Sequence, residues 1–155
     1  MSAAEPADDR AVFDLFPEVM IDRDNIAHYR ALAQGRLVIN RCEDCGFWIY
    51  PHRPLCPQCL SWNIEPTEVS GRGRVFTFTL LHQVRDPDSF LAEPVVAAAV
   101  ELAEQPGLRY LARIVGCPQD RLVLDMPVAL TWIDVQGRRW PAFAPAASRG
   151  AAAHG

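Results

Sequence analysis

The hydrophobic pattern divides the chain into a short helical lead, a compact middle segment and a β-rich body. Residues 25 to 34 carry apolar side chains at helical spacing, which predicts a helix with one apolar stripe. The stripe consists of Ile26, Tyr29 and Ala33. Asp24 is placed to cap the first turn, and Gly35 suits the left-handed position that follows the last turn of a helix.

The second half of the chain predicts five strands, the number found in a small Greek-key barrel of the OB type. The predicted strands are Val75 to Val84, Pro94 to Leu102, Leu108 to Val115, Val128 to Val135 and Arg139 to Phe143. Gly71 and Gly73 precede the first and longest strand, where a bulge would let it bend around two sides of a barrel. The run from Val95 to Val100 is compatible with either a buried strand or a contact strand.

Two shorter strands are expected between these regions, at Arg36 to Arg41 and at Trp48 to Pro51. Four cysteines, Cys42, Cys45, Cys56 and Cys59, stand around the second of them as two C-x-x-C pairs ten residues apart. Two such turns direct four thiolates toward one point, which is the ligand set of a closed, structural zinc site. The middle segment is therefore predicted to be a zinc ribbon.

Other uses of these cysteines are less consistent with the sequence. Disulfides are disfavoured because the chain opens on an acidic stretch without an apolar signal run, so we expect a cytoplasmic protein. A redox C-x-x-C of the thioredoxin type normally occurs singly, at the start of a helix. His52 lies between the pairs and is an alternative ligand, but four thiolates already complete the site. Cys117 has no second thiol or histidine nearby in the sequence and is interpreted as a small packing residue.

Charge is concentrated at the start of the chain. Residues 1 to 24 hold seven acidic groups against two arginines, so the remaining body is nearly neutral although the net charge is −4. A neutral body does not attract nucleic acid from a distance. No apolar run reaches the roughly 18 to 20 residues of a membrane span. Because all fifteen cationic side chains are arginine, Schiff-base chemistry through a lysine of this chain is excluded.

The ends of the chain are polar and rich in alanine, and we expect residues 1 to about 12 and 144 to 155 to be disordered. The segment from Val12 to Pro17 contains large apolar residues, and it docks either on a partner or on the chain's own body. The expected fold is mostly β, with four segments. They are an acidic, partly disordered lead (1–23), a helix with a rubredoxin-like zinc ribbon (24–65), a five-stranded OB-fold (66–143) and a disordered tail (144–155).

Catalysis by this chain alone is not indicated. The predicted metal site is saturated, and no G-x-S-x-G, H-E-x-x-H or phosphate-binding loop occurs. The histidines are scattered: His28 on the helix, His52 in the ribbon, His82 in the first barrel strand and His154 in the tail. None of them stands beside a nucleophile in the sequence.

Several short motifs occur together in a fixed order, and the set is much more specific than any one of them. They are Cys42-Glu-Asp-Cys45-Gly, Tyr50-Pro51-His52-Arg53-Pro54, Cys56-Pro-Gln-Cys59, Val69-Ser70-Gly71-Arg72-Gly73 and Asp125-Met126-Pro127-Val128. Over about Tyr29 to Phe143 this set resembles the family first filed as domain of unknown function number thirty-five. That family joins a rubredoxin-like zinc ribbon to an OB-fold, and its members accompany thiolase-superfamily enzymes.

The resemblance implies an accessory, non-catalytic subunit of a thiolase-like enzyme or of an aldolase of the lipid-transfer-protein type. Such a subunit stabilises its partner and helps to bind or channel acyl-CoA thioesters, with sterol side-chain or aromatic acyl-CoA breakdown as the preferred setting. The implied cofactor is structural Zn²⁺, and the implied shared ligand is a coenzyme A thioester. The alternative function is a nucleic-acid-binding module, since zinc ribbons and OB-folds both serve that role.

A CoA thioester needs an apolar channel with arginines at its mouth for the phosphates. Arg53 in the ribbon and Arg72 and Arg74 before the first barrel strand are candidates, and ordinary surface positions are equally compatible with them. The nearby aromatic residues Trp48, Tyr50 and Phe76 are better interpreted as covering the metal and filling the seam between ribbon and barrel.

Overall fold

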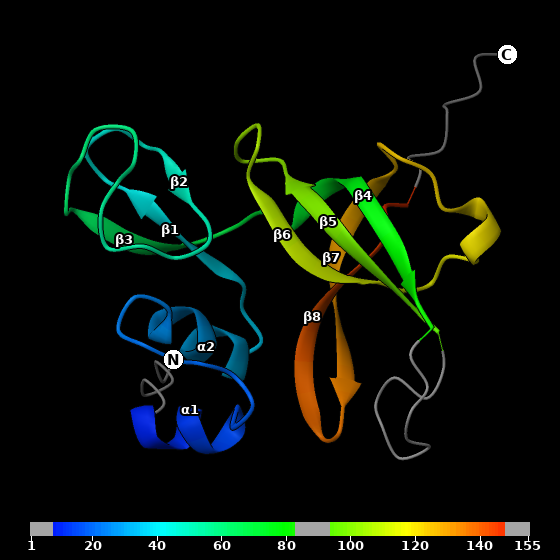
Figure 1. Cartoon of the computed structure of the whole chain (residues 1–155), viewed down its shortest axis with the longest axis horizontal. Helices are drawn as coiled ribbons and strands as arrows, with labels where there is room; N and C mark the ends of the chain where they lie inside the picture. The colour runs from blue at the N-terminus through cyan, green and yellow to red at the C-terminus, as the bar shows by residue number, and fades with distance from the viewer. Residues whose placement is uncertain (1–7, 83–93, 148–155) are drawn as a thin grey trace, which may run out of the picture.

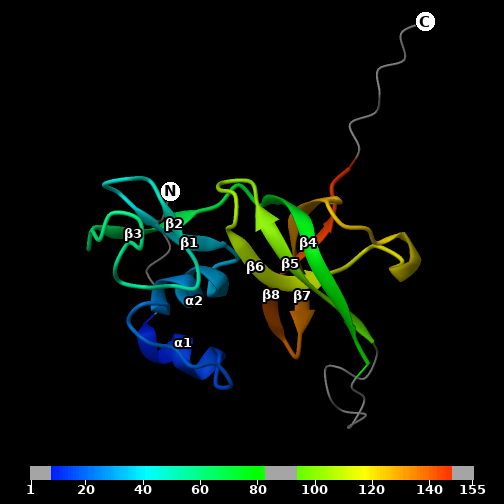
Figure 2. The same cartoon turned by 45° about the horizontal axis from the view of Figure 1, so that its top comes forward.

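The protein is described here by a computed structural model, which covers residues 8–82 and 94–147. Within these residues two α-helices lie beside a three-stranded sheet, and a closed five-stranded barrel follows (Figure 1). In Figure 2 the helices and the small sheet lie together on one side of the barrel. This arrangement confirms the expected mostly β fold, with a helix and a cysteine ribbon ahead of an OB-type barrel.

The small sheet has the strand order β2-β1-β3 and the barrel the order β4-β5-β6-β8-β7. All neighbouring strands are antiparallel except β6 and β8, which run parallel and close the barrel. The elements are α1 (Asp9–Leu15), α2 (Ile26–Ala33), β1 (Val38–Cys42), β2 (Trp48–Ile49), β3 (Ile64–Glu68), β4 (Arg72–Leu81), β5 (Val95–Leu102), β6 (Arg109–Ile114), the 3-10 helix η1 (Gln119–Arg121), β7 (Pro127–Val135) and β8 (Arg138–Pro145). None of the described helices is long and apolar enough to span a bilayer.

Helix α1 corrects the expectation that residues up to about 12 are disordered, because regular structure begins at residue 9. Val12 and Phe16 are each 1% exposed, and the Phe16 ring lies 5.3 Å from the rings of both Tyr29 and Trp140. The apolar segment at the start of the chain therefore docks on the chain's own body. Phe13, on the outer side of the helix, remains 49% exposed.

Helix α2 begins at Ile26, with Asn25 and not Asp24 in the N-cap position, so the expected cap is wrong. The Asn25 side chain does not cap the helix, because its Oδ1 accepts a hydrogen bond from the Asp22 N–H at 2.9 Å. The Asp22 carboxylate accepts from the N–H groups of Asp24 and Asn25, so these side chains build the turn ahead of the helix. Gly35 follows the helix with φ +71°, as predicted.

Strand β4 begins at Arg72, three residues before the predicted start at Val75. Arg72 to Arg74 pair with β7, and the pairing with β5 runs from Gly73 to Leu81, so the strand contributes to two sides of the barrel as expected. The bulge, however, lies between Val75 and Thr77 and not at the preceding glycines. Gly73 serves a close approach instead, because a Cβ atom there would lie 2.6 Å from the Glu101 carbonyl oxygen. The predicted end of this strand, at residues 83 and 84, lies outside the described residues.

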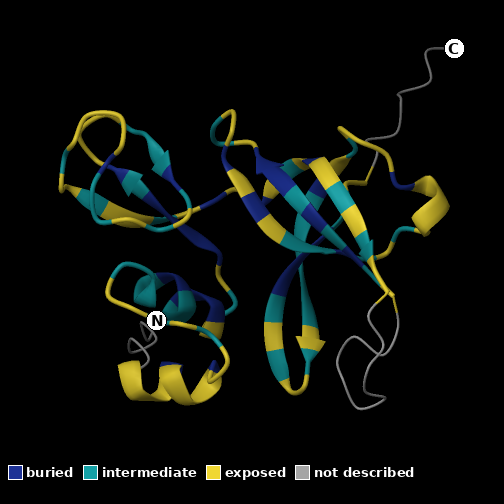
Figure 3. Ribbon diagram, in the orientation of Figure 1, coloured by how far each residue is buried: buried dark blue, intermediate teal, exposed yellow. Residues whose placement is uncertain are grey.

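The run from Val95 to Val100, which the sequence left as either a buried strand or a contact strand, belongs to strand β5. Its side chains alternate, with Val96, Ala98 and Val100 buried while Ala97 and Ala99 are only half-buried. Figure 3 shows a similar alternation over the first three residues of β6, Arg109 to Leu111. The run is therefore a barrel strand with one face in the core and the other face lining a cavity described below.

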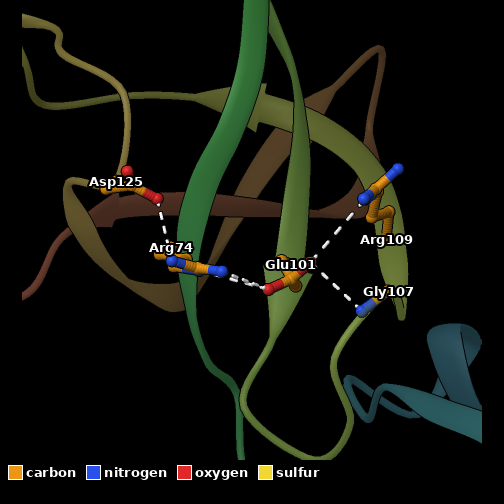
Figure 4. Close-up of polar contacts among 5 residues, drawn as sticks. All are labelled: Arg74, Glu101, Gly107, Arg109 and Asp125. Atoms are coloured by element: carbon orange, nitrogen blue, oxygen red, sulfur yellow. Dashed lines mark hydrogen bonds and ion pairs between the residues drawn. The ribbon is translucent and has the colours of Figure 1, made fainter.

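Glu101 links the strands at one end of the barrel (Figure 4). Its carboxylate accepts hydrogen bonds from the Arg74 guanidinium, the shorter at 2.6 Å, and from the Gly107 N–H at 3.1 Å. Arg109 forms a third contact at 3.7 Å, and Arg74 also donates to Asp125 at 2.9 Å. Arg74 is the largest influence that lowers the pKa of Glu101, so the carboxylate stays ionised. This cluster joins β4, β5, β6 and the loop before β7.

The turn at residues 104 to 107 connects β5 to β6 and also fixes the ribbon to the barrel. The Gln105 amide donates to the Trp48 carbonyl oxygen at 3.1 Å and accepts from the Trp48 N–H at 2.9 Å. A side-chain amide thus pairs with both backbone groups of one residue in β2, in the manner of a neighbouring strand. The ribbon and the barrel are therefore held in a defined relative position.

We predict that Phe16→Ala lowers the free energy of unfolding by about 3–5 kcal/mol, because it empties a fully buried site between α1, α2 and β8. The matched control is Phe13→Ala on the exposed side of the same helix, for which we expect a change within about 0.5 kcal/mol. Urea unfolding followed by circular dichroism measures both. Equal effects of the two substitutions would show that α1 is not docked as described.

Candidate functional site

The four predicted cysteine ligands converge on one point. Cys42 ends β1 and Cys45 follows in a turn, while Cys56 and Cys59 belong to the loop before β3. The sulfur atoms of Cys42 and Cys59 lie 3.6 Å apart, as do those of Cys45 and Cys56, and all four fall within 4.8 Å of one another. A tetrahedron with Zn–S bonds of ~2.3 Å has edges of about 3.8 Å, so the four thiols fit a zinc ion.

Backbone geometry explains why these two turns can hold a metal. Gly46 has φ +78° and Leu60 has φ +61°, and each donates its N–H to the carbonyl oxygen of the first cysteine of its pair, at 2.8 and 2.9 Å. Burial opposes ionisation of Cys42, but the N–H groups of Cys45 and Asp44 lower its pKa to about 7. The first turn therefore favours the thiolate of Cys42, which is the form that binds metal. Burial and the neighbouring thiols raise the pKa values of Cys45 and Cys59.

Other side chains brace the two turns against each other. The Asp44 carboxylate in the first turn accepts hydrogen bonds from the Ser61 hydroxyl and, at 3.0 Å, from the Asn63 amide beyond the second turn. Contacts of this kind fix the orientation of the ligating loops. A site with four thiolates leaves no coordination position for a substrate, so its chemistry is structural.

His52 is not a member of the converging group. Its ring packs 4.7 Å from the ring of His28 and 5.4 Å from that of Tyr50. Both ring nitrogens are buried, and neither has a hydrogen-bond partner among the described residues. Burial, followed by the influence of His28, lowers the pKa of His52 to about 4. The ring is therefore neutral at pH 7 and joins the packing between the ribbon and α2.

A cavity of about 890 Å³ lies where α2, the ribbon and the barrel meet. This volume is within the range of small-molecule sites, about 300–1,000 Å³. Its lining comes from the segment before α2, from α2 itself, from Tyr50 directly after β2, from β4, β5, β6, β7 and β8, and from the turn between β7 and β8. The described lining residues are Glu18, His28, Tyr29, Leu32, Tyr50, Thr77, Phe78, Thr79, Ala97, Ala98, Ala99, Tyr110, Leu111, Ala112, Arg113, Ile133, Val135, Gln136, Arg138, Trp140 and Pro141. Most of them are apolar or small, so the cavity suits a largely apolar occupant.

The polar wall of the cavity is a cluster of one histidine and three tyrosines. His28 Nδ1 lies 2.9 Å from the Val38 carbonyl oxygen and must donate to it, which leaves Nε2 to accept from the Tyr110 hydroxyl at 3.4 Å. The Tyr50 ring lies 5.2 Å from that of Tyr110, and the Tyr29 ring lies 5.1 Å from that of His28. Burial lowers the pKa of His28 and raises the pKa of each tyrosine, so all four groups are neutral at pH 7.

The structure separates the three arginines proposed for CoA phosphates from this cavity. Arg53 lines a smaller cavity of about 400 Å³ beside the ribbon, together with Arg23 and Trp62. Arg72 is exposed at the start of β4, and Arg74 is paired with acidic groups (Figure 4). None of the three is among the described residues that line the larger cavity. Their contact with CoA stays a prediction.

The cations at the larger cavity are Arg113 and Arg138, which the sequence reasoning missed. Arg138 forms an ion pair with Glu18 at 2.6 Å and donates to the Leu15 carbonyl oxygen at 3.0 Å, so it ties α1 and the following segment to β8. No sequence motif marks either arginine. The available signal was the strand periodicity of β6, which places Arg113 on the face opposite the buried Tyr110 and Ile114.

The three candidate aromatic residues lie in different surroundings. Tyr50 lines the cavity, while Trp48 packs against the core at the junction with the barrel. Phe76 is 39% exposed, and the Arg109 guanidinium lies 3.5 Å above its ring. The expectation that these residues fill the seam is therefore met by Trp48 but not by Phe76.

We predict that Cys42→Ser abolishes stoichiometric zinc binding and unfolds the ribbon, because one ligand of a closed site contributes to both metal affinity and folding. Cys117→Ser is the matched control and should retain one zinc ion per chain, since Cys117 lies apart from the converging thiols. Metal content by mass spectrometry, with near-ultraviolet circular dichroism, measures both effects. A folded, zinc-replete Cys42→Ser protein would refute the ligand assignment.

A second prediction concerns pH. His28 and His52 are kept neutral in the fold, whereas the same groups in the unfolded chain bind protons below about pH 6.5. Stability should therefore be constant above pH 6.5 and fall between pH 6.5 and 5, by up to about 1.4 kcal/mol per pH unit for each histidine. His52→Gln should reduce this slope, and His82→Gln, at an exposed position, should not. Identical slopes for wild type and His52→Gln in urea unfolding would contradict the account.

Two family models match the chain. Residues 30–65 match "ChsH2, rubredoxin-like zinc ribbon domain", and residues 66–132 match "ChsH2, C-terminal OB-fold domain". Among solved structures, a chain of the "Ltp2-ChsH2(DUF35) aldolase" is 34% identical with a TM-score of 0.72, and the match covers 83% of this chain and 98% of that one. A DUF35-family structure from Sulfolobus solfataricus, with 18% identity and a TM-score of 0.57 over 88% and 96% of the two chains, shares the fold.

Curated relatives include a "Probable enoyl-CoA hydratase alpha subunit" of Thermomonospora curvata, 36% identical over 85% of this chain and 40% of the relative. A "DUF35 domain-containing scaffold protein" of Methanocaldococcus jannaschii is 35% identical over 57% of this chain and 61% of the relative. The "3-oxo-4,17-pregnadiene-20-carboxyl-CoA hydratase alpha subunit" of Mycobacterium tuberculosis is 34% identical over 78% and 39%. The chain thus spans 39% to 61% of the length of these relatives. With its converging cysteines and closed barrel, the chain belongs to the ChsH2/DUF35 family of zinc-ribbon and OB-fold proteins.

Proposed function

We propose that this protein is a non-catalytic accessory subunit of a thiolase-superfamily enzyme, with an aldolase of the lipid-transfer-protein type as the preferred partner. In this role it stabilises the partner and helps to bind or channel an acyl-CoA thioester. The observation that supports the proposal most strongly is the apolar cavity of about 890 Å³ held between the ribbon, α2 and the barrel. Such a cavity has room for an acyl group but offers no reactive group of its own.

The chemistry of the described lining supports binding and not reaction. It contains no cysteine, serine or lysine, and both nitrogens of His28 are already in hydrogen-bond contact with Val38 and Tyr110. The metal site is a closed set of four thiols, at which a substrate oxygen would find no vacant position. A thioester bound in the cavity therefore needs a second protein to supply the catalytic groups.

The relatives support a role within a hetero-oligomer. Two of them are named as alpha subunits of acyl-CoA hydratases, one is named as a scaffold protein, and the structural relative belongs to an aldolase whose name joins two proteins. The pregnadiene-carboxyl-CoA relative favours sterol side-chain breakdown as the setting of the proposed partner. A cytoplasmic location remains part of the proposal.

The alternative function, a nucleic-acid-binding module, has less support in the structure. Nucleic-acid binding needs a local basic patch, for which Arg72, Arg74 and Arg85 are the candidates in the sequence. Arg74 is neutralised by Glu101 and Asp125, and Arg85 lies outside the described residues. The aromatic rings at the cavity are packed edge to face or tilted against one another, and do not form an open stacking platform.

The proposal predicts that catalysis requires two proteins. The tagged chain is purified with the thiolase-superfamily enzyme that accompanies it in its own cells, and acyl-CoA turnover is measured for each protein alone and for the mixture. We expect no turnover by this chain, and a rise of at least about tenfold when it is added to its partner. Cys42→Ser should fail to give this rise, whereas Cys117→Ser should give it in full. Turnover by the isolated chain at the rate of the complex would overturn the accessory role.

A further inference from the structure

We propose that Tyr29 and Tyr50 form a recognition point for an uncharged acceptor oxygen, such as a ketone, on a flat apolar ligand that lies in the large cavity. The inference rests on the proposed acyl-CoA-handling function for the identity of the ligand as an acyl group. It adds which part of that group this chain would select, and with which atoms.

The first observation is the hydrogen bonding of the tyrosine cluster. The Tyr110 hydroxyl donates to His28 Nε2, which is bound on its other side to the Val38 carbonyl oxygen. Tyr29 and Tyr50 line the same cavity, and neither hydroxyl has a hydrogen-bond partner among the described residues. A hydroxyl in a largely apolar cavity without a partner is unfavourable unless a ligand or water satisfies it. Two such donors on one wall are suited to a single acceptor oxygen.

The second observation is the charge state of this wall. Burial raises the pKa of Tyr29 and Tyr50, so both phenols keep their protons and act as donors at pH 7. Of the two arginines that line the cavity, Arg138 is already paired with Glu18 at 2.6 Å and bound to a backbone carbonyl oxygen, and Arg113 also has an interaction partner. Neutral donors beside a neutralised cation favour an uncharged oxygen over a carboxylate, whose desolvation is much more costly.

The third observation is the shape of the cavity floor. Thr77, Ala99 and Leu111 lie side by side on β4, β5 and β6, and the next outward-facing row consists of Thr79, Ala97 and Arg113. With strands about 4.8 Å apart and rows about 6.7 Å apart, these two rows form a shelf roughly 10 Å wide and 7 Å long. Its centre carries only alanine methyl groups. A shelf of this kind admits the flat face of a fused-ring body.

The walls around the shelf are bulky. The bulky lining residues include Ile133 of β7, Trp140 of β8, and Tyr29 and Leu32 of α2. The tyrosine cluster occupies the wall formed by α2 and the end of β2. A fused-ring ligand with a terminal ketone can therefore lie on the methyl groups while its oxygen reaches the two phenols.

The test measures binding of two probes to the full-length, zinc-loaded chain by equilibrium dialysis. The probes are 5α-androstan-3-one, an uncharged tetracyclic ketone, and 5α-androstane, the same hydrocarbon without the oxygen. Wild type should bind the ketone more tightly than the hydrocarbon. Tyr29→Phe and Tyr50→Phe keep the rings and remove only the hydroxyls, so each should weaken ketone binding by about 3- to 10-fold and change hydrocarbon binding by less than about 2-fold.

Matched substitutions test the shelf separately. Ala99→Phe places a ring on the centre of the shelf and should weaken the binding of both probes by more than about 10-fold. Ala103→Phe, at an exposed turn position outside the described lining, should change neither. Equal affinities of the wild-type protein for ketone and hydrocarbon would overturn the recognition point. Unchanged ketone affinity in both Tyr29→Phe and Tyr50→Phe would also overturn it. Absence of ketone binding up to its solubility limit would overturn the cavity as a ligand site.

The outcomes separate this inference from the proposed function. Association with the partner enzyme is measured on the same proteins by size-exclusion chromatography, and it should be unchanged in Tyr29→Phe and Tyr50→Phe. If the wild-type protein binds the ketone more tightly than the hydrocarbon but does not bind the partner enzyme, the accessory function fails and the recognition point stands. If the complex forms and turns over acyl-CoA while ketone discrimination is absent, only the recognition point fails.

Discussion

The convergence of four cysteine sulfurs on one point is the interaction on which the rest of this structure depends. The ribbon's own buried core contains only Cys42, Ile49 and Cys56, with Phe47 and Ile64 packed against it. A core of this size cannot stabilise an independent fold without a metal or another staple. The ribbon nevertheless supplies Tyr50 and His52 to the junction with α2 and the barrel. The shape of the cavity therefore depends on a metal site that does not touch it.

This dependence assigns different tasks to the parts of the molecule. The barrel supplies a floor of short side chains and is stabilised by its own core and by the cluster around Glu101. Helix α2 and the segment before it line one part of the cavity, and the ion pair between Arg138 and Glu18 holds this segment to β8. The metal fixes the ribbon, and Gln105 fixes the ribbon to the barrel. All of these devices position groups for binding, which agrees with an accessory subunit better than with an independent enzyme.

The sequence predicted the features whose signal is local. The cysteine spacing indicated the ribbon, the apolar, β-rich runs indicated the barrel strands, and Gly35 marked the end of α2. Prediction from the sequence failed for elements whose structure depends on tertiary contacts. Helix α1 has only seven residues and is stabilised by burial of Val12 and Phe16, which no local pattern reveals.

The candidate site was harder to predict because it is assembled from residues distant in the sequence. Arg74 was predicted as a phosphate ligand, and the sequence did not show that the fold pairs it with Glu101. Arg138 showed no motif although it lines the cavity and is paired with Glu18. The tyrosine cluster joins residues 29, 50 and 110, which three separate elements bring together. The predicted zinc ligands, in contrast, are neighbours in sequence, and their positions fit a metal ion.

The most direct test of this account is amide hydrogen exchange on the zinc-loaded protein before and after removal of the metal with a strong chelator. The account predicts that protection is lost in the ribbon and at the residues beside it that form the cavity wall, His28 and Tyr110 among them. Protection of the barrel core, at Val100 and Phe143, should persist. If protection at the cavity wall is unchanged in metal-free protein, the metal does not hold the cavity and the central claim is wrong.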